Sequence, residues 1–305
     1  KRGIKNAADG KMLKTVEQDL TFESPKPKVR FIGSGSILPN SQGLIFPFEA
    51  ISLKAVDVRI IRIYEKNVQH FLQVNDLDGD DELTRFGKII AESKVRLDGD
   101  KSKDLDQWNT HVINLEKWIT AEPGAIYQVA IKFNKSYTTC KCVDEKERDF
   151  VKTAEDGWNE RDWHEYGFDG YSTWSYRDDG SPCTDSYYYG KAIQKNILAS
   201  NIGMVFKLDV EKRATAFLSD MLTTAPMANA EVAYYDYTTR LIAKGTTNSN
   251  GEISTNLKRK PFLMIAKKGN QRGYLKLTDG KVNSLSKFDV SGTYAEEGIK
   301  GFLYA

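Results

Sequence analysis

Alternating apolar and polar residues mark much of this chain as β-strand. Between residues 29 and 64, the sequence VRFIGSGSILPNSQGLIFPFEAISLKAVDVRIIRIY contains three short strands separated by turn-forming residues. From Val56 to Ile60, apolar and charged residues alternate with period two, which predicts one buried face and one wetted face. The phase of this alternation flips at Ile60-Ile61, and such a flip predicts a β-bulge or a change of sheet.

Other apolar runs extend the β pattern through the first two thirds of the chain. Residues 44–50 are almost uninterruptedly apolar, which predicts a strand covered on both faces, with Pro47 at an edge or a bulge. A helical turn is expected at residues 67–74. Further strands are expected on either side of the turn at Asp98-Gly99 and after it, at residues 88–97, 108–115 and 127–133.

The last third of the chain shows regularly spaced strands and turns without a helical period. Asn248 to Gly251 and Asp279-Gly280 are strong hairpin turns. This spacing predicts a seven-stranded antiparallel sandwich of about a hundred residues. The strands are expected at residues 214–218, 231–237, 241–246, 252–257, 262–267, 274–277 and 298–304, after a lead-in at 196–208.

The pattern divides the chain into two full domains and a short leading segment. Residues 1–24 place an Asp-Gly turn between two strand ends, which fits either the last hairpin of a preceding Ig-like domain or an N-terminal extension. Residues 25–199 are expected to form a first β-sandwich with an insertion at 138–190, and residues 200–305 a second sandwich. Since the chain starts at Lys1 and its final strand runs to the last residue, we expect it to be cut from a larger protein.

The insertion differs from the rest of the chain in charge and aromatic content. The whole chain has a formal charge of +2, yet residues 144–189 hold thirteen acidic and five basic residues. Dense aromatic residues form a candidate recognition surface for sugars or protein partners, or else an insertion that buries its rings against the sandwich. These residues are Trp158, Trp163, Trp174, Tyr187, Tyr188 and Tyr189.

Three cysteines flank the insertion. Cys183 is expected to form a disulfide with Cys142 or Cys140, which leaves one thiol over and hints at an oxidising compartment. The Cys140-x-Cys142 pair with His164 is a poor zinc site, because zinc ligands favour two-residue spacers. The carboxylates at residues 75–82 lack the spacing of an EF-hand loop, so a solvated turn is expected there and no metal or cofactor.

No enzymatic motif accompanies these features. The histidines His70, His111 and His164 are scattered, and none lies in a hydrolase, metalloprotease or catalytic-cysteine context. The small net charge gives no reason to expect nucleic acid as a partner. We therefore expect a protein without catalytic activity.

Several segments resemble the N-terminal half of bacterial alpha-2-macroglobulins, in the form typical of Bacteroidetes. They are the stretch from residue 29 to FLQ at 71–73, AEPGAIYQVAIKF, NILASNIGMVFKL, and the run ATAFLSDMLTTAPMANAEVAYYDYTTRLIAKGTTNSNGEIS. The resemblance implies an all-β chain of tandem Ig-like, macroglobulin-like antiparallel β-sandwiches, the first of them carrying the long acidic and aromatic insertion.

Members of that family are protease traps of the cell envelope or secreted proteins, in which a protease cuts a bait segment and many members then capture it through a Cys-x-Glu-Gln thioester. Neither Cys140, followed by Lys141-Cys142-Val143, nor Cys183, followed by Thr184-Asp185-Ser186, fits that motif. The resemblance thus implies a structural, non-catalytic part of an inhibitor, with the thioester elsewhere.

The partners and location implied by the resemblance follow from this role. Proteases would be met through the full-length protein, neighbouring macroglobulin-like domains would be contacts within the chain, and envelope or peptidoglycan-synthesis proteins are further candidate partners. The protein is expected in the cell envelope, periplasmic or at the surface, held by a lipid anchor. The alternative function is a cell-surface adhesin or carbohydrate-binding sandwich that uses the aromatic insertion.

Overall fold

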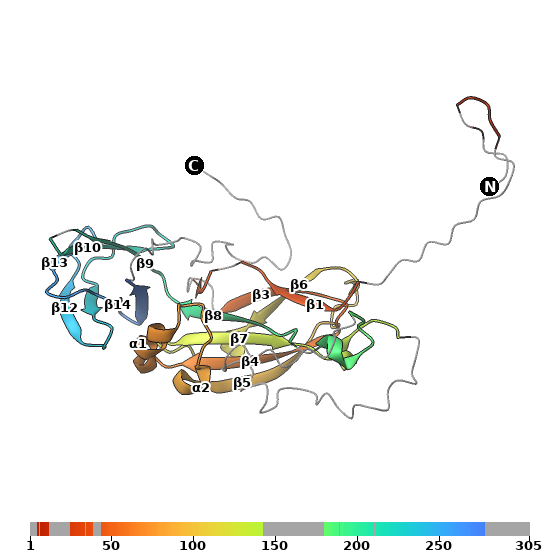
Figure 1. Ribbon diagram of the computed structural model, residues 1–305, viewed down its shortest axis with the longest axis horizontal. Helices are drawn as coiled ribbons and strands as arrows, with labels where there is room; N and C mark the ends of the chain where they lie inside the picture. Colours follow the sequence, from red (N-terminus) through yellow and green to blue (C-terminus); the bar gives the residue numbers. More distant parts are fainter. Residues whose placement is uncertain are drawn as a thin grey trace.

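The chain forms two β-units arranged one after the other along the long axis of the molecule (Figure 1). The computed structural model describes residues 5, 7–11, 25–33, 35–38, 44–142, 180–188, 190–209 and 211–277. We call the sheets built from β1 to β8 the first unit and those built from β9 to β15 the second unit. The predicted all-β class, with antiparallel sandwiches, is confirmed.

The first unit packs a three-stranded sheet against a five-stranded sheet. The three-stranded sheet has the order β1 (Lys28–Phe31), β3 (Ile45–Ile51), β6 (Asn109–Asn114). The five-stranded sheet has the order β2 (Ile37–Leu38), β8 (Ile193–Ala199), β7 (Ile126–Lys132), β4 (Ala55–Ile63), β5 (Gly87–Arg96). All neighbours are antiparallel except β2 and β8, which run parallel.

The phase flip at Ile60-Ile61 coincides with a register shift, but it arises because a different apolar cluster covers β4 from that point on. The register between β4 and β5 shifts there, as predicted, and the residue that has no partner is Ile90 on β5. The pairing of β4 with β7 is continuous, so the side chains of β4 keep alternating. Val56, Val58 and Ile60 bury one face of β4 in the sandwich core, whereas Ile61 and Ile63 bury the opposite face in a second apolar cluster.

The predicted wetted face of β4 is wrong. Asp57 and Arg59 are 3% and 2% exposed. The Tyr137 hydroxyl donates a 2.9 Å hydrogen bond to Asp57 Oδ1, and Arg59 Nε donates one of 2.7 Å to Glu92 Oε1. A central strand is covered on both faces, and its charged residues are tolerated there because each is paired.

Other predicted strands are present, but some differ from the prediction in their place within the sheets. The strands expected on either side of Asp98-Gly99 exist as β5 and β6 but lie in different sheets, because the chain crosses from one layer to the other. Pro47 lies in the central strand β3, between β1 and β6. The pairing of β3 with β1 ends at Phe48, so no β1 residue pairs with Pro47. The N–H group that proline lacks is therefore not needed on the β1 side.

Among the described residues, the second unit is a sandwich of seven strands, β9 to β15. One sheet has the order β13 (Glu252–Asn256), β10 (Arg213–Asp220), β9 (Ile202–Leu208). The other has the order β12 (Leu241–Thr246), β11 (Glu231–Tyr235), β14 (Leu263–Lys268), β15 (Gln271–Lys276). The seventh strand is β9, within the expected lead-in, whereas the strand expected at 298–304 lies outside the described residues.

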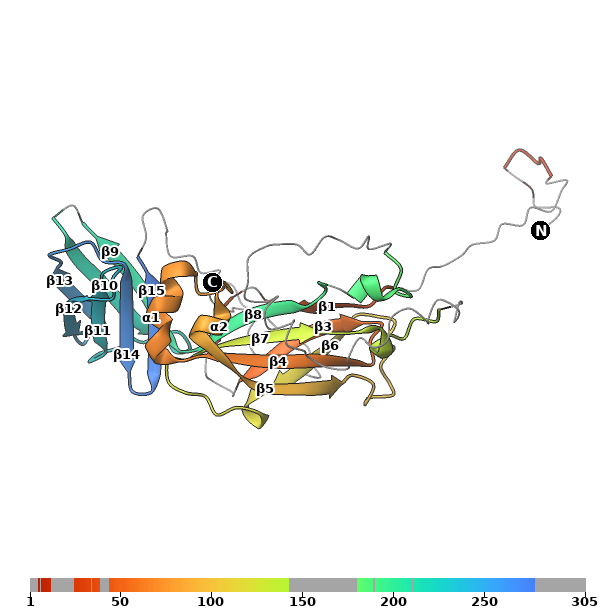
Figure 2. The ribbon, with the colours of Figure 1, turned by 60° about the horizontal axis from the view of Figure 1, so that its bottom comes forward.

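Among the described residues, helices are few and short. They are α1 (Glu65–Val74), α2 (Leu83–Phe86) and the 3-10 turns η1 (Leu115–Lys117), η2 (Lys135–Tyr137) and η4 (Asp185–Tyr188). The helical turn expected at 67–74 is therefore a full helix. Within the described ranges, none of these helices has the length and apolar character needed to cross a bilayer. Figure 2 shows α1 standing between the first unit and β14.

Of the leading segment, the described part is a turn closed by a single antiparallel bridge between Lys5 and Lys11. The amine of Lys5 also donates a 3.0 Å hydrogen bond to Asp9 Oδ1, across the same turn. The rest of residues 1–24 lies outside the described residues.

Candidate functional site at the junction of the two units

Helix α1 builds the first-unit side of the junction. It starts directly after β4, and Val68, Phe71 and Leu72 form an apolar stripe on one face because they are spaced by three and four residues. The helix ends at Asn75, whose backbone N–H donates to Phe71 O and whose side-chain amide holds the loop up to Asp81. The stripe therefore points away from the helix's own polar face and needs a partner surface.

That surface comes from both units: Phe71 packs edge-on against Phe86 of α2, with ring centroids 5.8 Å apart, and residues of β14 join the same apolar cluster. On β14, Leu263 and Ile265 belong to the apolar cluster shared with the first unit, while Met264 and Ala266 belong to the core of the second sandwich. This double burial explains why residues 262–266 read as a continuous apolar run. The junction core shares these residues of both units: Ile61, Ile63, Val68, Phe71, Leu72, Leu83, Phe86, Ile126 and Leu198 from the first, and Phe262, Leu263, Ile265 and Tyr274 from the second.

Glu65 is the polar centre of the junction. It is the first residue of α1, where a negative charge complements the helix dipole. Its carboxylate accepts a 2.9 Å hydrogen bond from Arg272 Nε and lies 3.1 Å from Lys267 Nζ, both from the second unit. Burial raises the pKa of Glu65, but the hydrogen bonds from Arg272 and Lys267 outweigh it and bring the pKa below its ordinary value of 4.5.

Tyr274 adds a buried contact beside Glu65. Its side chain is 6% exposed, and its hydroxyl donates a 2.8 Å hydrogen bond to Gly124 O in the turn before β7. Burial, with the nearby charge of Glu65, raises the pKa of the Tyr274 hydroxyl well above its usual range. The hydroxyl therefore stays protonated and remains a donor across the junction.

Two further contacts close the rim. Lys276 Nζ donates a 2.9 Å hydrogen bond to Asn75 O and lies 3.2 Å from Asp76 Oδ1. On the other side, the Gln73 amide donates to Tyr237 O. The junction thus has an apolar centre and a polar rim from both units, which is the anatomy of a stable protein interface.

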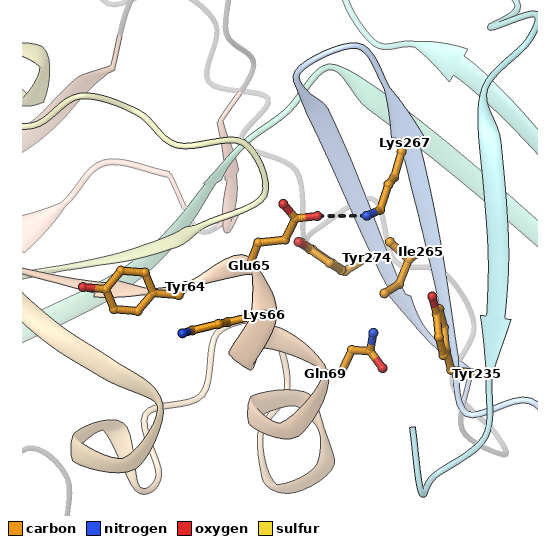
Figure 3. A pocket seen from close by; sticks show the side chains of 8 residues that line it. All are labelled: Tyr64, Glu65, Lys66, Gln69, Tyr235, Ile265, Lys267 and Tyr274. Carbon is orange, nitrogen blue, oxygen red and sulfur yellow. Dashed lines mark ion pairs between the residues drawn. The ribbon is translucent and has the colours of Figure 1, made fainter. Parts of the chain in front are cut away.

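A cleft of about 420 Å³ opens beside this rim (Figure 3). Its walls come from both units, and Glu65 and Lys267 reach across it toward each other. The lining residues are Tyr64, Glu65, Lys66, Gln69, Tyr235, Ile265, Lys267 and Tyr274. Glu65 and Lys267 of its lining already pair with each other, so we interpret the cleft as a gap along the junction between the units.

The cysteines lie far from this junction. The structure joins Cys142 to Cys183 by a disulfide, one of the two pairings left open by the sequence, and Cys140 is a free, half-buried thiol. Both ends of the insertion lie near the entry of the chain into the first unit, because Cys140 Sγ is 3.7 Å from Pro25 O and Tyr187 donates to Pro27 O at 2.9 Å.

The candidate recognition surface is not formed as expected where the structure describes it. Tyr187 is 2% exposed and belongs to the core of the first unit, so it offers no surface to a partner. Tyr188 is half-buried and stacks edge-on against Phe133 and Tyr187. Trp158, Trp163, Trp174 and Tyr189 lie outside the described residues.

The described ranges contain no group of three or more His, Cys, Asp or Glu side chains placed to hold a metal ion. His111 is half-buried on β6 against Phe48, with ring centroids 5.6 Å apart. Burial and the charge of Lys103 lower the pKa of His111 to about 4. It is therefore a neutral packing residue at ordinary pH.

The junction residues carry no motif in the sequence that marks them as a site. Glu65, Arg272 and Tyr274 meet although some 200 residues separate them along the chain. The apolar stripe of α1 and the non-alternating run at 262–266 each indicate a buried surface. Neither pattern identifies the surface that packs against it.

Comparisons with known proteins agree with this architecture. The family model of the bacterial alpha-2-macroglobulin MG3 domain matches residues 199–295. The crystal structure of native alpha-2-macroglobulin from Escherichia coli spanning domains MG0-NIE-MG1 is similar, with a TM-score of 0.53 and 15% identity over 91% of this chain and 72% of that chain.

A cryo-EM reconstruction of the native conformation of E. coli alpha-2-macroglobulin gives a TM-score of 0.51 at 15% identity, over 90% of this chain and 14% of that chain. No curated protein matches the sequence significantly. The predicted resemblance to bacterial alpha-2-macroglobulins is thereby confirmed, without its Bacteroidetes form: residues 199–295 match the model of the MG3 domain of these proteins, and the fold is similar to that of solved alpha-2-macroglobulins.

Proposed function

We propose that this chain is a non-catalytic structural part of a bacterial alpha-2-macroglobulin-like protein that traps proteases. The observation that carries the proposal is the match of residues 199–295 to the MG3 domain model. The chain spans 14% of the native E. coli alpha-2-macroglobulin. We therefore propose protease trapping for the whole parent protein, and a supporting structural role for this segment.

The junction supports an architectural role. A core shared by both units, an ion cluster around Glu65 and the Tyr274 hydrogen bond together hold the MG3 domain against the first unit. The chain offers no Cys-x-Glu-Gln sequence for covalent capture. Its proposed task is to fix where neighbouring domains sit.

The test compares the isolated chain with its parent protein. Each is incubated with an endopeptidase, and the remaining activity is measured on a large protein substrate and on a small chromogenic peptide. A caged protease keeps its active site, so we expect the parent to block only the large substrate. The isolated chain is expected to block neither.

Two results would overturn the proposal. One is inhibition of either substrate by the isolated chain, which would place an inhibitory site within it. The other is a parent protein that leaves hydrolysis of the large substrate unchanged after its own cleavage by the protease.

Location in the cell envelope is a further part of the proposal, as are the lipid anchor, the envelope partners and the Bacteroidetes form. The Cys142–Cys183 disulfide supports a compartment outside the reducing cytosol. Thiol labelling of the protein taken directly from cells, with the labelled residues mapped, tests this: Cys140 is expected to react while Cys142 and Cys183 do not, and labelling of all three would contradict it.

The alternative, a carbohydrate-binding module, rests on Trp158, Trp163 and Trp174 in the sequence. A glycan array combined with acrylamide quenching of tryptophan fluorescence separates the two functions. A sugar hit together with strong quenching would favour the alternative.

A further inference from the structure

The connection between the two units is short and buried. Only Ser200 and Asn201 separate the end of β8 from the start of β9, and they are 1% and 8% exposed. Linkers between domains that move independently are exposed, and they are rich in glycine, proline and polar residues crossed by few contacts. This connection has the opposite character.

The backbone of the connection is bonded to both units. Ser200 N–H donates to Leu38 O in the first unit at 3.2 Å. Asn201 N–H donates to Gln271 Oε1 at 2.8 Å, and Asn201 O accepts from Met221 N–H at 2.8 Å, both in the second unit. The Ser200 hydroxyl accepts from the N–H of Ile202 at 3.1 Å, which fixes the bend itself.

The residues on either side of the connection are anchored in apolar cores. Leu198 is fully buried in the junction core, and Ile202 is fully buried in the core of the second sandwich. The β15 backbone lies directly against β9, because a Cβ added at Gly273 would stand 2.8 Å from Met204 Cε and 3.3 Å from Ile202 Cγ2. There is no free length of chain in which a rotation could be absorbed.

We propose that residues 198–202 form a rigid elbow that fixes the angle between the two units, so that the units move as a single body. Bending at this point would break hydrogen bonds of buried groups that water does not reach, and it would open the junction core. Shape changes of the parent protein would then occur at other domain boundaries. The inference concerns mechanics, and it holds whether or not the parent traps proteases.

The test measures a distance between spin labels on the two units in the 305-residue chain. Labels are placed at exposed strand positions, through Lys88→Cys on β5 and Lys244→Cys on β12, in a Cys140→Ser background that keeps the disulfide. A second pair of labels within the second unit, at Lys207→Cys and Lys244→Cys, serves as the reference. It gives the width of the distance distribution that arises from the flexibility of the labels alone. We expect the distance distribution between the units to be as narrow as that within the second unit.

The elbow is then loosened by the double substitution Ser200→Gly and Gln271→Ala. It removes the acceptors for Ile202 N–H and Asn201 N–H, and we expect the distribution between the units to broaden while the distribution within the second unit stays unchanged. The matched control, Ser254→Gly with Gln107→Ala, makes the same changes away from the junction and is expected to leave both distributions narrow.

A broad or two-peaked distribution in the unmodified elbow would overturn the inference, and so would a loosened elbow that stays narrow. If the double variant fails to fold, hydrogen exchange on the unmodified chain tests whether the elbow is rigid. The amides of Asn201 and Ile202 are expected to exchange as slowly as those inside β8 and β9, and rapid exchange would contradict the elbow.

Discussion

The hydroxyl of Tyr274 on β15 donates a 2.8 Å hydrogen bond to the carbonyl oxygen of Gly124, which lies in the turn before β7. Gly124 has a φ of +74°, and an added Cβ would stand 2.5 Å from Arg272 Cγ and 2.6 Å from the Tyr274 hydroxyl oxygen. A turn of the first unit therefore touches the second unit so closely that only glycine fits.

Gly124→Ala is expected to lower the free energy of unfolding by about 2–4 kcal/mol, because it combines a left-handed backbone with a clash at the junction. Gly269→Ala is the matched control. Gly269 also has positive φ, but nothing lies within 4 Å of its added Cβ, so a cost of about 1 kcal/mol is expected from the backbone alone. Guanidinium unfolding measures both, and equal losses would contradict the tight approach at Gly124.

Two buried tyrosines differ in what their hydroxyls contact. The Tyr274 hydroxyl bonds Gly124 O, whereas the Tyr234 hydroxyl has no hydrogen-bond partner among the described residues, and its burial raises the pKa of Tyr234 to about 12. Tyr274→Phe is expected to cost about 1–2 kcal/mol, because it leaves a buried carbonyl unpaired. Tyr234→Phe is expected to be neutral or slightly stabilising. The reverse order in unfolding measurements would contradict the junction hydrogen bond.

The strands and their kinds were predictable because period-two patterns and turn residues are local signals. The flip at Ile60-Ile61 predicted a bulge, and the structure shows the register shift there. The burial of Asp57 and Arg59 was not predictable, since their partners Tyr137 and Glu92 are distant in sequence. The charges of Asp57 and Arg59 predicted solvent exposure, but pairing with residues distant in sequence allows both side chains to be buried.

The acid sensitivity of the junction follows from Glu65. Its pKa is lowered in the folded state, so its contribution to stability is present above pH 4.5 and is lost as the pH falls through the folded-state pKa. Glu65→Gln is expected to cost on the order of 1 kcal/mol at pH 7, since the side chain is about one third exposed. The difference from the unmodified chain should shrink below pH 4.5 in thermal unfolding scans.

Glu82→Gln is the control for that series. Glu82 pairs with Arg85 within the first unit, on an exposed surface, and its loss is expected to cost no more than about 0.5 kcal/mol. A Glu65→Gln loss that is no larger, or that persists unchanged at acid pH, would show that the Glu65 ion cluster does not stabilise the junction.

The disulfide stabilises the first unit by closing a loop over a separation of 41 residues. Replacing both Cys142 and Cys183 by serine is expected to lower the free energy of unfolding by about 4 kcal/mol in the chain-entropy model. Changing both residues prevents Cys140 from forming a substitute bond. Cys140→Ser alone is expected to change stability little, and a comparable loss from it would contradict the assigned pairing.

The junction itself lay beyond sequence reasoning for a physical reason. The stripe of Val68, Phe71 and Leu72 and the run at residues 262–266 each show that a surface must be buried. Apolar burial is not directional, so neither pattern identifies the surface that covers it. Only the folded chain shows that both surfaces belong to one apolar cluster, together with Phe86 of α2 and the ends of β4, β7 and β8.

The central claim is that the two units share one core at their junction. Differential scanning calorimetry of the 305-residue chain tests it most directly, by comparing the calorimetric enthalpy with the van't Hoff enthalpy. The account predicts one transition with equal enthalpies, which Gly124→Ala shifts as a whole to lower temperature. Two separate transitions in the unmodified chain, of which Gly124→Ala moves neither, would contradict it.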